Sequence, residues 1–223
     1  MTGDDDFEAF VRRAMPRLLA TAVLYCGHRQ RAEDAVQEAL VEVYGRWSSL
    51  RSPEAYAETV VRRRLARDGR RWWSRWKPVE IDSVPMPAAS TVESEANVRA
   101  ILYALTLLPR RQRQILVMAA LRQMSHREIS EELGVSVGTV GPTLAKARAR
   151  VAALLGHAPS GRSDNTLVPS APSVRISGLE GLLDPVDTAL RSAEASLAAG
   201  FTQDATTLAR LRTAVCAAVG AGR

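Results

Sequence analysis

The chain has 223 residues, with 30 Lys and Arg against 24 Asp and Glu, which gives a formal net charge of +6. A chain of this length has room for one or two domains, each with a core of its own. The charge is uneven: residues 1–155 hold 24 basic and 18 acidic side chains, whereas residues 156–223 hold six of each. This basic surplus indicates a polyanionic partner for the first two thirds of the chain.

Several classes of protein are disfavoured by the same sequence. No segment approaches the roughly 20 apolar residues that a transmembrane helix needs, and residues 1–6 lack the positive start of a signal peptide. The two cysteines, Cys26 and Cys216, have no metal-ligand spacing, which favours a reducing compartment over a disulfide framework. We therefore expect a soluble cytoplasmic protein with no membrane insertion, no metal site and no cofactor.

Three amphipathic helices are predicted for residues 1–76, the first domain. Apolar side chains recur every three or four residues from Phe7 to Val23 and again from Ala32 to Tyr44. A third helix begins at Pro53, because proline is favoured in the first turn, and it continues toward Trp76. No stretch of any length alternates with the period of a strand, so the expected fold class is all-α.

The end of the third helix combines positive charge with aromatic rings. Asp68 is the only acidic residue among eight basic ones: Arg62, Arg63, Arg64, Arg67, Arg70, Arg71, Arg75 and Lys77. Interleaved with them are Trp72, Trp73 and Trp76. Arginines neutralise phosphates, and unpaired bases stack on tryptophan with about 1–3 kcal/mol per base. The cluster favours binding of single-stranded or opened DNA; the alternative is a set of core tryptophans beside a solvated arginine face.

The remaining chain is predicted to contain two linkers, a second helical domain and an extension. Residues 77–92, with three prolines, form a flexible linker, and residues 93–155 form a small helical domain. Residues 156–178, rich in Pro, Ser and Gly, form a second linker. Residues 179–223 then contain two amphipathic helices, separated near Gly200.

A helix-turn-helix is predicted within residues 124–140. Ile129 and Leu133 share one face of a short helix, and Gly134 follows where a positive φ is needed. Ser136 is expected to cap the next helix, with its hydroxyl accepting from the Thr139 amide. The second helix of such a pair usually enters a DNA major groove; the alternative is a helical hairpin with no role in DNA binding.

Four motifs in this order resemble those of the extracytoplasmic-function type of bacterial RNA polymerase sigma factor. They are Ala-Glu-Asp-Ala-Val-Gln-Glu at residues 32–38, the arginine-rich third helix, Ala-Leu-x-x-Leu-Pro-x-x-x-Arg at residues 104–113, and Glu-Ile-x-x-x-Leu-Gly-Val-Ser-x-Gly-Thr-Val at residues 128–140. The resemblance covers about residues 7–155. It implies a region 2-like domain of three helices and a region 4-like helix-turn-helix domain.

The resemblance also implies a function and a set of site residues. Such a protein binds core RNA polymerase, recognises the −10 and −35 promoter elements and promotes DNA opening, while the polymerase performs the chemistry; we therefore expect no enzyme activity and no catalytic residue. The linker at residues 77–92 would lie near the active-site cleft of the polymerase. The surface for the β′ clamp helices would be formed by Glu33, Asp34, Gln37 and Glu38.

Both promoter elements would be contacted by residues that match the family's motifs. The −10 element would meet Tyr56, Arg63, Arg64, Arg67, Arg70, Arg71, Trp72 and Trp73. The −35 element would meet Arg127, Ser136, Val137, Thr139, Thr143 and Lys146, in a domain that also contacts the β flap. An anti-sigma factor is a further partner that the resemblance implies.

Two features depart from the family pattern. Gly141-Pro142 replaces the usual Lys-Ser, and Pro142 cannot donate to the carbonyl of Gly138, so we expect the recognition helix to kink or restart there and −35 reading to weaken. The extension is expected either to dock on the sigma domains or a regulator, tuning activity, or to be a weakly folded appendage. Two other functions stay open: a stand-alone helix-turn-helix regulator, and an interaction module that titrates polymerase or a regulator.

Overall fold

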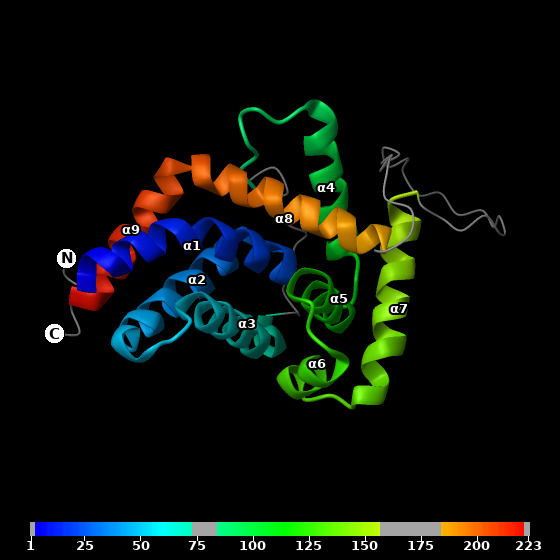
Figure 1. The fold of residues 1–223 in the computed structure, drawn as a ribbon. Helices are drawn as coiled ribbons and strands as arrows, with labels where there is room; N and C mark the ends of the chain where they lie inside the picture. The colour runs from blue at the N-terminus through cyan, green and yellow to red at the C-terminus, as the bar shows by residue number, and fades with distance from the viewer. Residues whose placement is uncertain (1–2, 73–83, 157–183, 221–223) are drawn as a thin grey trace. The chain divides into compact units, whose positions relative to one another are not determined.

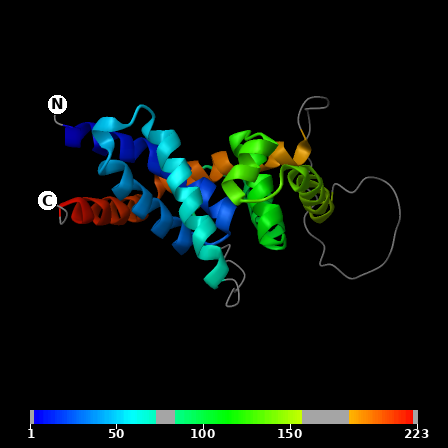
Figure 2. The same cartoon turned by 90° about the horizontal axis from the view of Figure 1, so that it is seen from below.

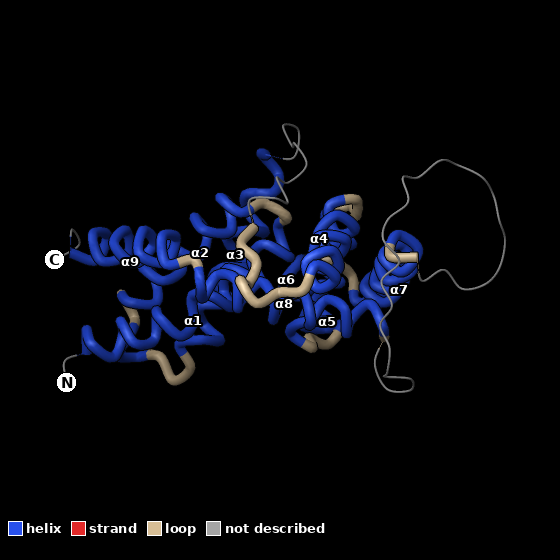
Figure 3. Tube along the Cα trace, turned by 90° about the horizontal axis from the view of Figure 1, so that it is seen from above, coloured by secondary structure: helices blue, strands red, loops and turns tan. Residues whose placement is uncertain are grey.

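The computed structural model describes residues 3–72, 84–156 and 184–220, and for residues 3–4 and 67–72 it describes the backbone only. Within these ranges all regular structure is helical, which confirms the all-α prediction (Figure 3). None of the described helices is long and apolar enough to cross a membrane. The chain forms two compact units, one of Met1–Ala89 with Glu194–Arg223 and one of Ser90–Ala193.

The first unit is built on three helices that pack against one another: α1 (Gly3–Cys26), α2 (Arg29–Tyr44) and α3 (Pro53–Trp72). Their apolar stripes form its core, which includes the fully buried Leu19, Val23, Val36 and Leu40. Between α1 and α2, Gly27 has a φ of 71°, a conformation that glycine adopts at little cost. The imidazole of His28 then accepts from the amide of Arg31 and caps the start of α2.

Aromatic side chains close one end of this unit. Phe7 meets Tyr44 edge-on with ring centroids 4.9 Å apart, and Phe7 and Phe10 lie 5.2 and 5.1 Å from Trp47. Trp47 belongs to a short 3-10 helix, η1 (Trp47–Ser49), that joins α2 to α3. Edge-to-face packing of this kind contributes beyond the buried area alone, and it ties the beginning of α1 to the end of α2.

The second unit contains α4 (Val92–Thr106), α5 (Arg110–Arg122), α6 (His126–Leu133) and α7 (Val137–Leu154). Its core includes Leu105, Leu116, Met118, Ile129 and Val140. A complete arginine side chain is also buried in it, since Arg113 has no exposed surface and donates to the carbonyl of Leu105 at 3.5 Å.

The two last helices, α8 (Pro185–Gln203) and α9 (Ala205–Gly220), form the described part of the extension. Residues of α8 up to Ala193 belong to the second unit, and there Arg191 donates to the carbonyl of Ala120 on α5 at 3.0 Å. Arg148 of α7 pairs with Asp187 at 3.0 Å, and this hydrogen bond raises the pKa of Arg148 despite its partial burial. The start of α8 is therefore anchored on α5 and α7.

The end of α8 and all of α9 belong to the first unit. Helix α9 lies alongside α1 and α2 (Figures 1 and 2). It buries Leu211 and Val215, while Phe201 at the end of α8 is completely buried. The described part of the extension is therefore packed. This favours an extension that docks on the sigma-like domains over a weakly folded appendage.

Candidate functional site

The polar surface predicted on α2 is divided in the structure. Asp34 and Glu38 are exposed and Gln37 is half-buried, whereas only 1% of Glu33 is exposed. Asp34 accepts from the side-chain Nε2 of Gln30 at 3.0 Å, a contact within the exposed side of its own helix. Three of the four predicted residues therefore present polar groups to solvent, and Glu33 does not.

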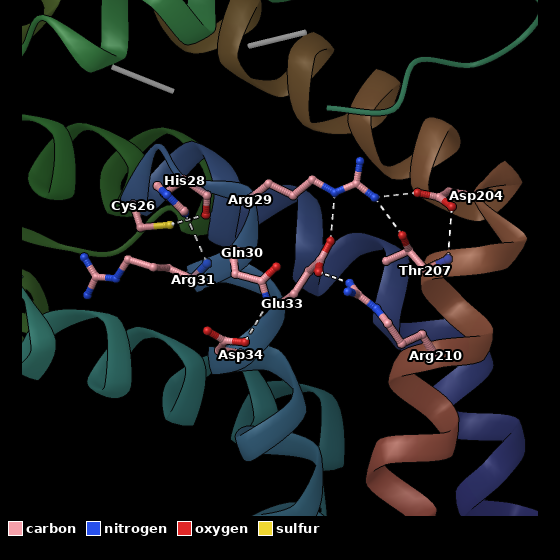
Figure 4. Close-up of polar contacts among 10 residues, drawn as sticks. All are labelled: Cys26, His28, Arg29, Gln30, Arg31, Glu33, Asp34, Asp204, Thr207 and Arg210. Carbon is pink, nitrogen blue, oxygen red and sulfur yellow. Dashed lines mark hydrogen bonds and ion pairs between the residues drawn. The ribbon is translucent and has the colours of Figure 1, made fainter. Parts of the chain in front are cut away.

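Glu33 is covered by the extension. It accepts from Nε of Arg29 at 2.8 Å on one side, and it pairs with Arg210 of α9 on the other (Figure 4). A buried carboxylate is costly unless it is paired and hydrogen-bonded, and the two arginines supply both conditions. The expectation that Glu33 lies on an open face of α2 is wrong, because α9 covers that position.

Arg29 links Glu33 to the first turn of α9. Its guanidinium donates to Asp204 at 2.7 Å and to the Thr207 hydroxyl at 2.6 Å (Figure 4). It also lies 5.7 Å from the ring centre of Phe201. Burial alone would lower the pKa of Arg29, but hydrogen bonds to Glu33 and Asp204 and their negative charges outweigh burial and raise it. Arg29 therefore stays charged while it joins α2 to the extension.

The beginning of the basic surface on α3 is tied to α2. The Tyr56 hydroxyl donates to Glu42 at 2.8 Å, and Arg64 donates to Glu42 at 3.0 Å and also pairs with Glu38. The hydrogen bond from Tyr56, followed by that from Arg64, lowers the pKa of Glu42 and outweighs its partial burial; the same bond raises the pKa of Tyr56. Arg63, in contrast, is exposed.

The rest of the predicted −10 surface is less fully described. Arg67, Arg70, Arg71 and Trp72 lie in the last turns of α3, where only the backbone is described. Trp73 lies outside the described residues. The choice between stacked and core tryptophans therefore stays a prediction.

The helix-turn-helix has the connection expected from its sequence. Ser125 and Glu128 form a capping box at the start of α6, in which each side chain accepts from the other's backbone amide. The Ser125 hydroxyl also donates to the Glu128 carboxylate at 2.7 Å; this bond, followed by the one from the Ser125 amide, lowers the pKa of Glu128. Gly134 ends α6 with a φ of 62°, as predicted. The two helices pack against each other, and Ile129 of α6 and Val140 of α7 are both completely buried.

The start of α7 differs from the sequence prediction in two respects. Ser136 does occupy the N-cap, but its side chain makes no capping bond; instead the Thr139 amide donates to the Ser136 carbonyl at 3.0 Å, and the Thr139 hydroxyl does so at 2.7 Å. Of the kink or restart expected at Pro142, the restart is wrong, since α7 is one helix from Val137 to Leu154 with Pro142 inside; the kink stays a prediction.

The continuity of α7 through Pro142 has a local cause. The preceding residue, Gly141, has no Cβ to clash with the proline ring, which removes part of the restriction on a pre-proline residue. The carbonyl of Gly138, which loses its donor, belongs to an exposed residue that water can reach. The Thr143 hydroxyl also donates to the carbonyl of Thr139 at 2.6 Å, adding a bond within this turn.

Most of the residues predicted to contact the −35 element are exposed to solvent. Thr143 is half-buried, and the others are exposed: Arg127, Ser136, Val137, Thr139 and Lys146. Val137 is an apolar residue in the first turn of α7 that is nevertheless 49% exposed. Among the described residues, the outer side of α7 and Arg127 from α6 thus expose hydroxyl, methyl and cationic groups, and Arg127 also pairs with Glu131 of its own helix at 3.1 Å.

Comparisons with known proteins agree with this arrangement of helices. The Sigma-70 region 2 family matches residues 10–75, and the Sigma-70, region 4 family matches residues 98–151. The RNA polymerase sigma-E factor of Streptomyces avermitilis is 33% identical over 149 residues, which are 66% of this chain and 83% of that protein. The chain belongs to the extracytoplasmic-function family of RNA polymerase sigma factors. It is accordingly a transcription initiation factor, with region 2 in α1–α3 and region 4 in α4–α7.

Two further similarities complete the comparison. The ECF RNA polymerase sigma factor SigM of Mycobacterium tuberculosis is 32% identical over 159 residues, which are 70% of this chain and 80% of SigM. The crystal structure of the sigma factor RpoE in complex with the anti-sigma factor NepR from Bartonella quintana is similar with a TM-score of 0.49 and 22% identity. That alignment covers 68% of this chain and 97% of the other. Both sigma-factor regions of the present chain end before α8, so the extension lies outside them.

Proposed function

We propose that this sigma factor binds core RNA polymerase through the exposed side chains of α2 and recognises promoter DNA through α3 and α7. Asp34, Gln37 and Glu38 offer acidic and amide groups to a basic partner helix. The basic run that starts at Arg63 holds the −10 element, and the exposed first turns of α7 meet the −35 element. The observation that carries the proposal is the exposed outer side of α7 in a chain that also contains region 2.

The proposed division of labour leaves the chemistry to the polymerase. Unstacking promoter bases costs a few kcal/mol, and contacts with core enzyme and duplex DNA offset that cost. The sigma factor itself then supplies no catalytic group. Because transcription takes place where core polymerase and DNA are, we place the protein in the cytoplasm.

The test is reconstitution with core RNA polymerase purified from Streptomyces avermitilis. Templates with randomised −10 and −35 positions are transcribed with and without the sigma factor, and the templates that yield transcripts are sequenced. We expect a defined pair of promoter elements to be enriched only when the sigma factor is present. Transcribed templates that show no sequence preference at either element would contradict the proposal.

Two substitutions separate the proposed contacts. Glu38→Lys reverses a charge on α2 and is expected to reduce core binding at least tenfold, because like charges then face each other. Lys146→Ala on α7 is expected to leave core binding unchanged and to weaken binding of −35 duplexes at all sequences, as loss of a phosphate contact does. A matched control, Ala145→Ser, changes a neighbouring exposed residue without altering charge.

A further inference from the structure

The extension covers positions of this sigma factor that lie beside the α2 surface to which the proposed function assigns core enzyme. Residues 194–220, the end of α8 with α9, lie beyond both sigma-factor regions in the sequence but pack on region 2 in the structure. They cover two separate features: one end of α2 and the segment that follows region 2. Each is secured by contacts of its own.

The first feature is the Glu33 end of α2. Arg210 supplies a guanidinium to a carboxylate that otherwise continues the acidic surface of Asp34 and Glu38. Asp204 and Thr207 accept from the neighbouring Arg29, so the first turns of α9 contact both Arg29 and Glu33 through polar side chains (Figure 4). Arg210 therefore occupies the position that a cationic side chain of a partner helix would take.

The second feature is the chain at residues 84–88, part of the predicted linker. Val84 is buried, and the amide of Ala88 donates to the side chain of Gln203 at 2.7 Å. The contact with Gly200 is close: a Cβ added there would lie 2.2 Å from the carbonyl oxygen of Pro85. Only glycine at this position lets the segment lie against α8.

We propose that residues 194–220 act as an intramolecular inhibitor, which competes with core RNA polymerase for the Glu33 end of α2 and holds residues 84–88 on α8. This inference rests on the proposed function, because it takes α2 as the surface for core enzyme. Polymerase then binds the fraction of molecules in which α9 has detached, so the apparent affinity is reduced by that fraction.

The interface is suited to release as well as to docking. Arg210 is 56% exposed, so water and salt reach the outer member of its ion pair with Glu33. The apolar contribution of α9 is small, since Leu211 and Val215 are its only buried aliphatic residues in the described range. A basic partner that binds α2 can therefore exchange one cation for another at Glu33.

Hydrogen–deuterium exchange on the full-length protein tests the displacement directly. The sigma factor is measured alone and with a saturating amount of Streptomyces avermitilis core RNA polymerase. We expect the amides of α2 to become more protected and those of α9, residues 205–220, to exchange at least tenfold faster. Protection of α9 that stays the same or increases in the complex would overturn the inference while leaving the proposed function intact.

Two release variants, each with a matched control, test the competition. Arg210→Gln removes the cation at Glu33, and its control, Ala217→Glu, makes the same change in net charge at an exposed position of α9. Gly200→Val expels residues 84–88, and its control, Ala199→Val, places the same side chain at an exposed position of α8. Circular dichroism verifies that the total helix content of each variant equals that of the wild type.

The dissociation constant for the same core polymerase is then measured by biolayer interferometry. We expect each release variant to bind about three- to tenfold more tightly than the wild type, as a larger competent fraction predicts, and each control to bind like the wild type. Equal affinity of all five proteins would overturn the inference alone. Absence of core binding by all five would overturn the proposed function, and the inference with it.

Discussion

Asp204 shows how a single residue serves both an element and an interface. Its carboxylate accepts from the amide of Thr207 at 3.0 Å and so caps α9, and it also pairs with Arg29 of α2 at 2.7 Å. Burial alone would raise the pKa of Asp204, but hydrogen bonds from Thr207 and Arg29 and the charge of Arg29 outweigh burial and lower it. The charged form of Asp204 therefore stabilises the folded chain.

The pKa shift of Asp204 predicts a pH dependence. Its stabilisation is fully present above the ordinary aspartate pKa near 4 and is lost as the pH falls through the lower pKa of the folded state. Asp204→Asn keeps a good capping residue but removes the charge, so we expect it to lower the free energy of unfolding by about 1 kcal/mol at pH 6. Urea denaturation should show a smaller difference in the free energy of unfolding between wild type and variant at pH 3 than at pH 6. The same difference at both pH values would contradict a stabilising role for the Asp204 charge.

Replacing two glycines of the helix-turn-helix by alanine should change the stability of the second unit in opposite directions. Gly134 has a φ of 62°, where an L-residue costs about 1–2 kcal/mol, so Gly134→Ala should destabilise the second unit by about 1 kcal/mol. Gly138 lies within α7, and an added Cβ would be no closer than 3.8 Å to its neighbour, the Oγ of Ser136. Gly138→Ala should therefore stabilise by about 0.5–1 kcal/mol. Thermal unfolding of both variants measures the contrast.

At the scale of elements, α7 shows that a proline need not end a helix. Pro142 is exposed, and the adjacent Gly141 and Thr143 reduce the cost of a proline inside a helix. The hydrogen bond to Gly138 is nevertheless missing. Weakened −35 reading thus no longer follows from a broken helix, and only the absence of the usual lysine still supports it.

Restoring that hydrogen bond should stabilise α7. Pro142→Ala supplies a donor for the carbonyl of Gly138, so we expect the free energy of unfolding to rise by about 1–3 kcal/mol. The helix is already continuous, so binding of −35 duplexes should change less than twofold. Urea denaturation and fluorescence anisotropy measure the two quantities. A large gain in DNA binding would mean that the proline does distort the recognition surface.

The sequence predicts elements better than contacts between elements. The helical period, the positive φ of Gly134 and the family motifs depend on local pattern, and each is visible in the sequence. The Ser125–Glu128 capping box, which was not predicted, also follows a local pattern, a serine with a glutamate three residues later. The pairing of Glu33 with Arg210 joins residues 177 positions apart, and no local pattern distinguishes Arg210 from other exposed arginines.

At the scale of the whole molecule, the extension adds residues to the compact unit that contains region 2. The sequence pattern predicts two amphipathic helices in residues 179–223, but it does not say which surface receives their apolar sides. The structure places Phe201 against Arg29 and buries Glu194 beside α1, where the Thr21 hydroxyl donates to it at 2.5 Å. The extension therefore contributes both apolar and polar contacts to the first unit.

The burial of Phe201 predicts that the extension and region 2 share stability. Phe201→Ala removes a completely buried ring, for which losses of about 3–5 kcal/mol are typical, whereas the conservative Phe201→Leu should lose less than half as much. The loss should be confined to the first unit, because Phe201 belongs to it. Hydrogen–deuterium exchange should therefore show faster exchange in α1, α2 and α9, with amides of α5 protected as in the wild type. Equally faster exchange in α5 would mean that the two units unfold together. Unchanged exchange in α2 would mean that the extension adds nothing to the stability of region 2.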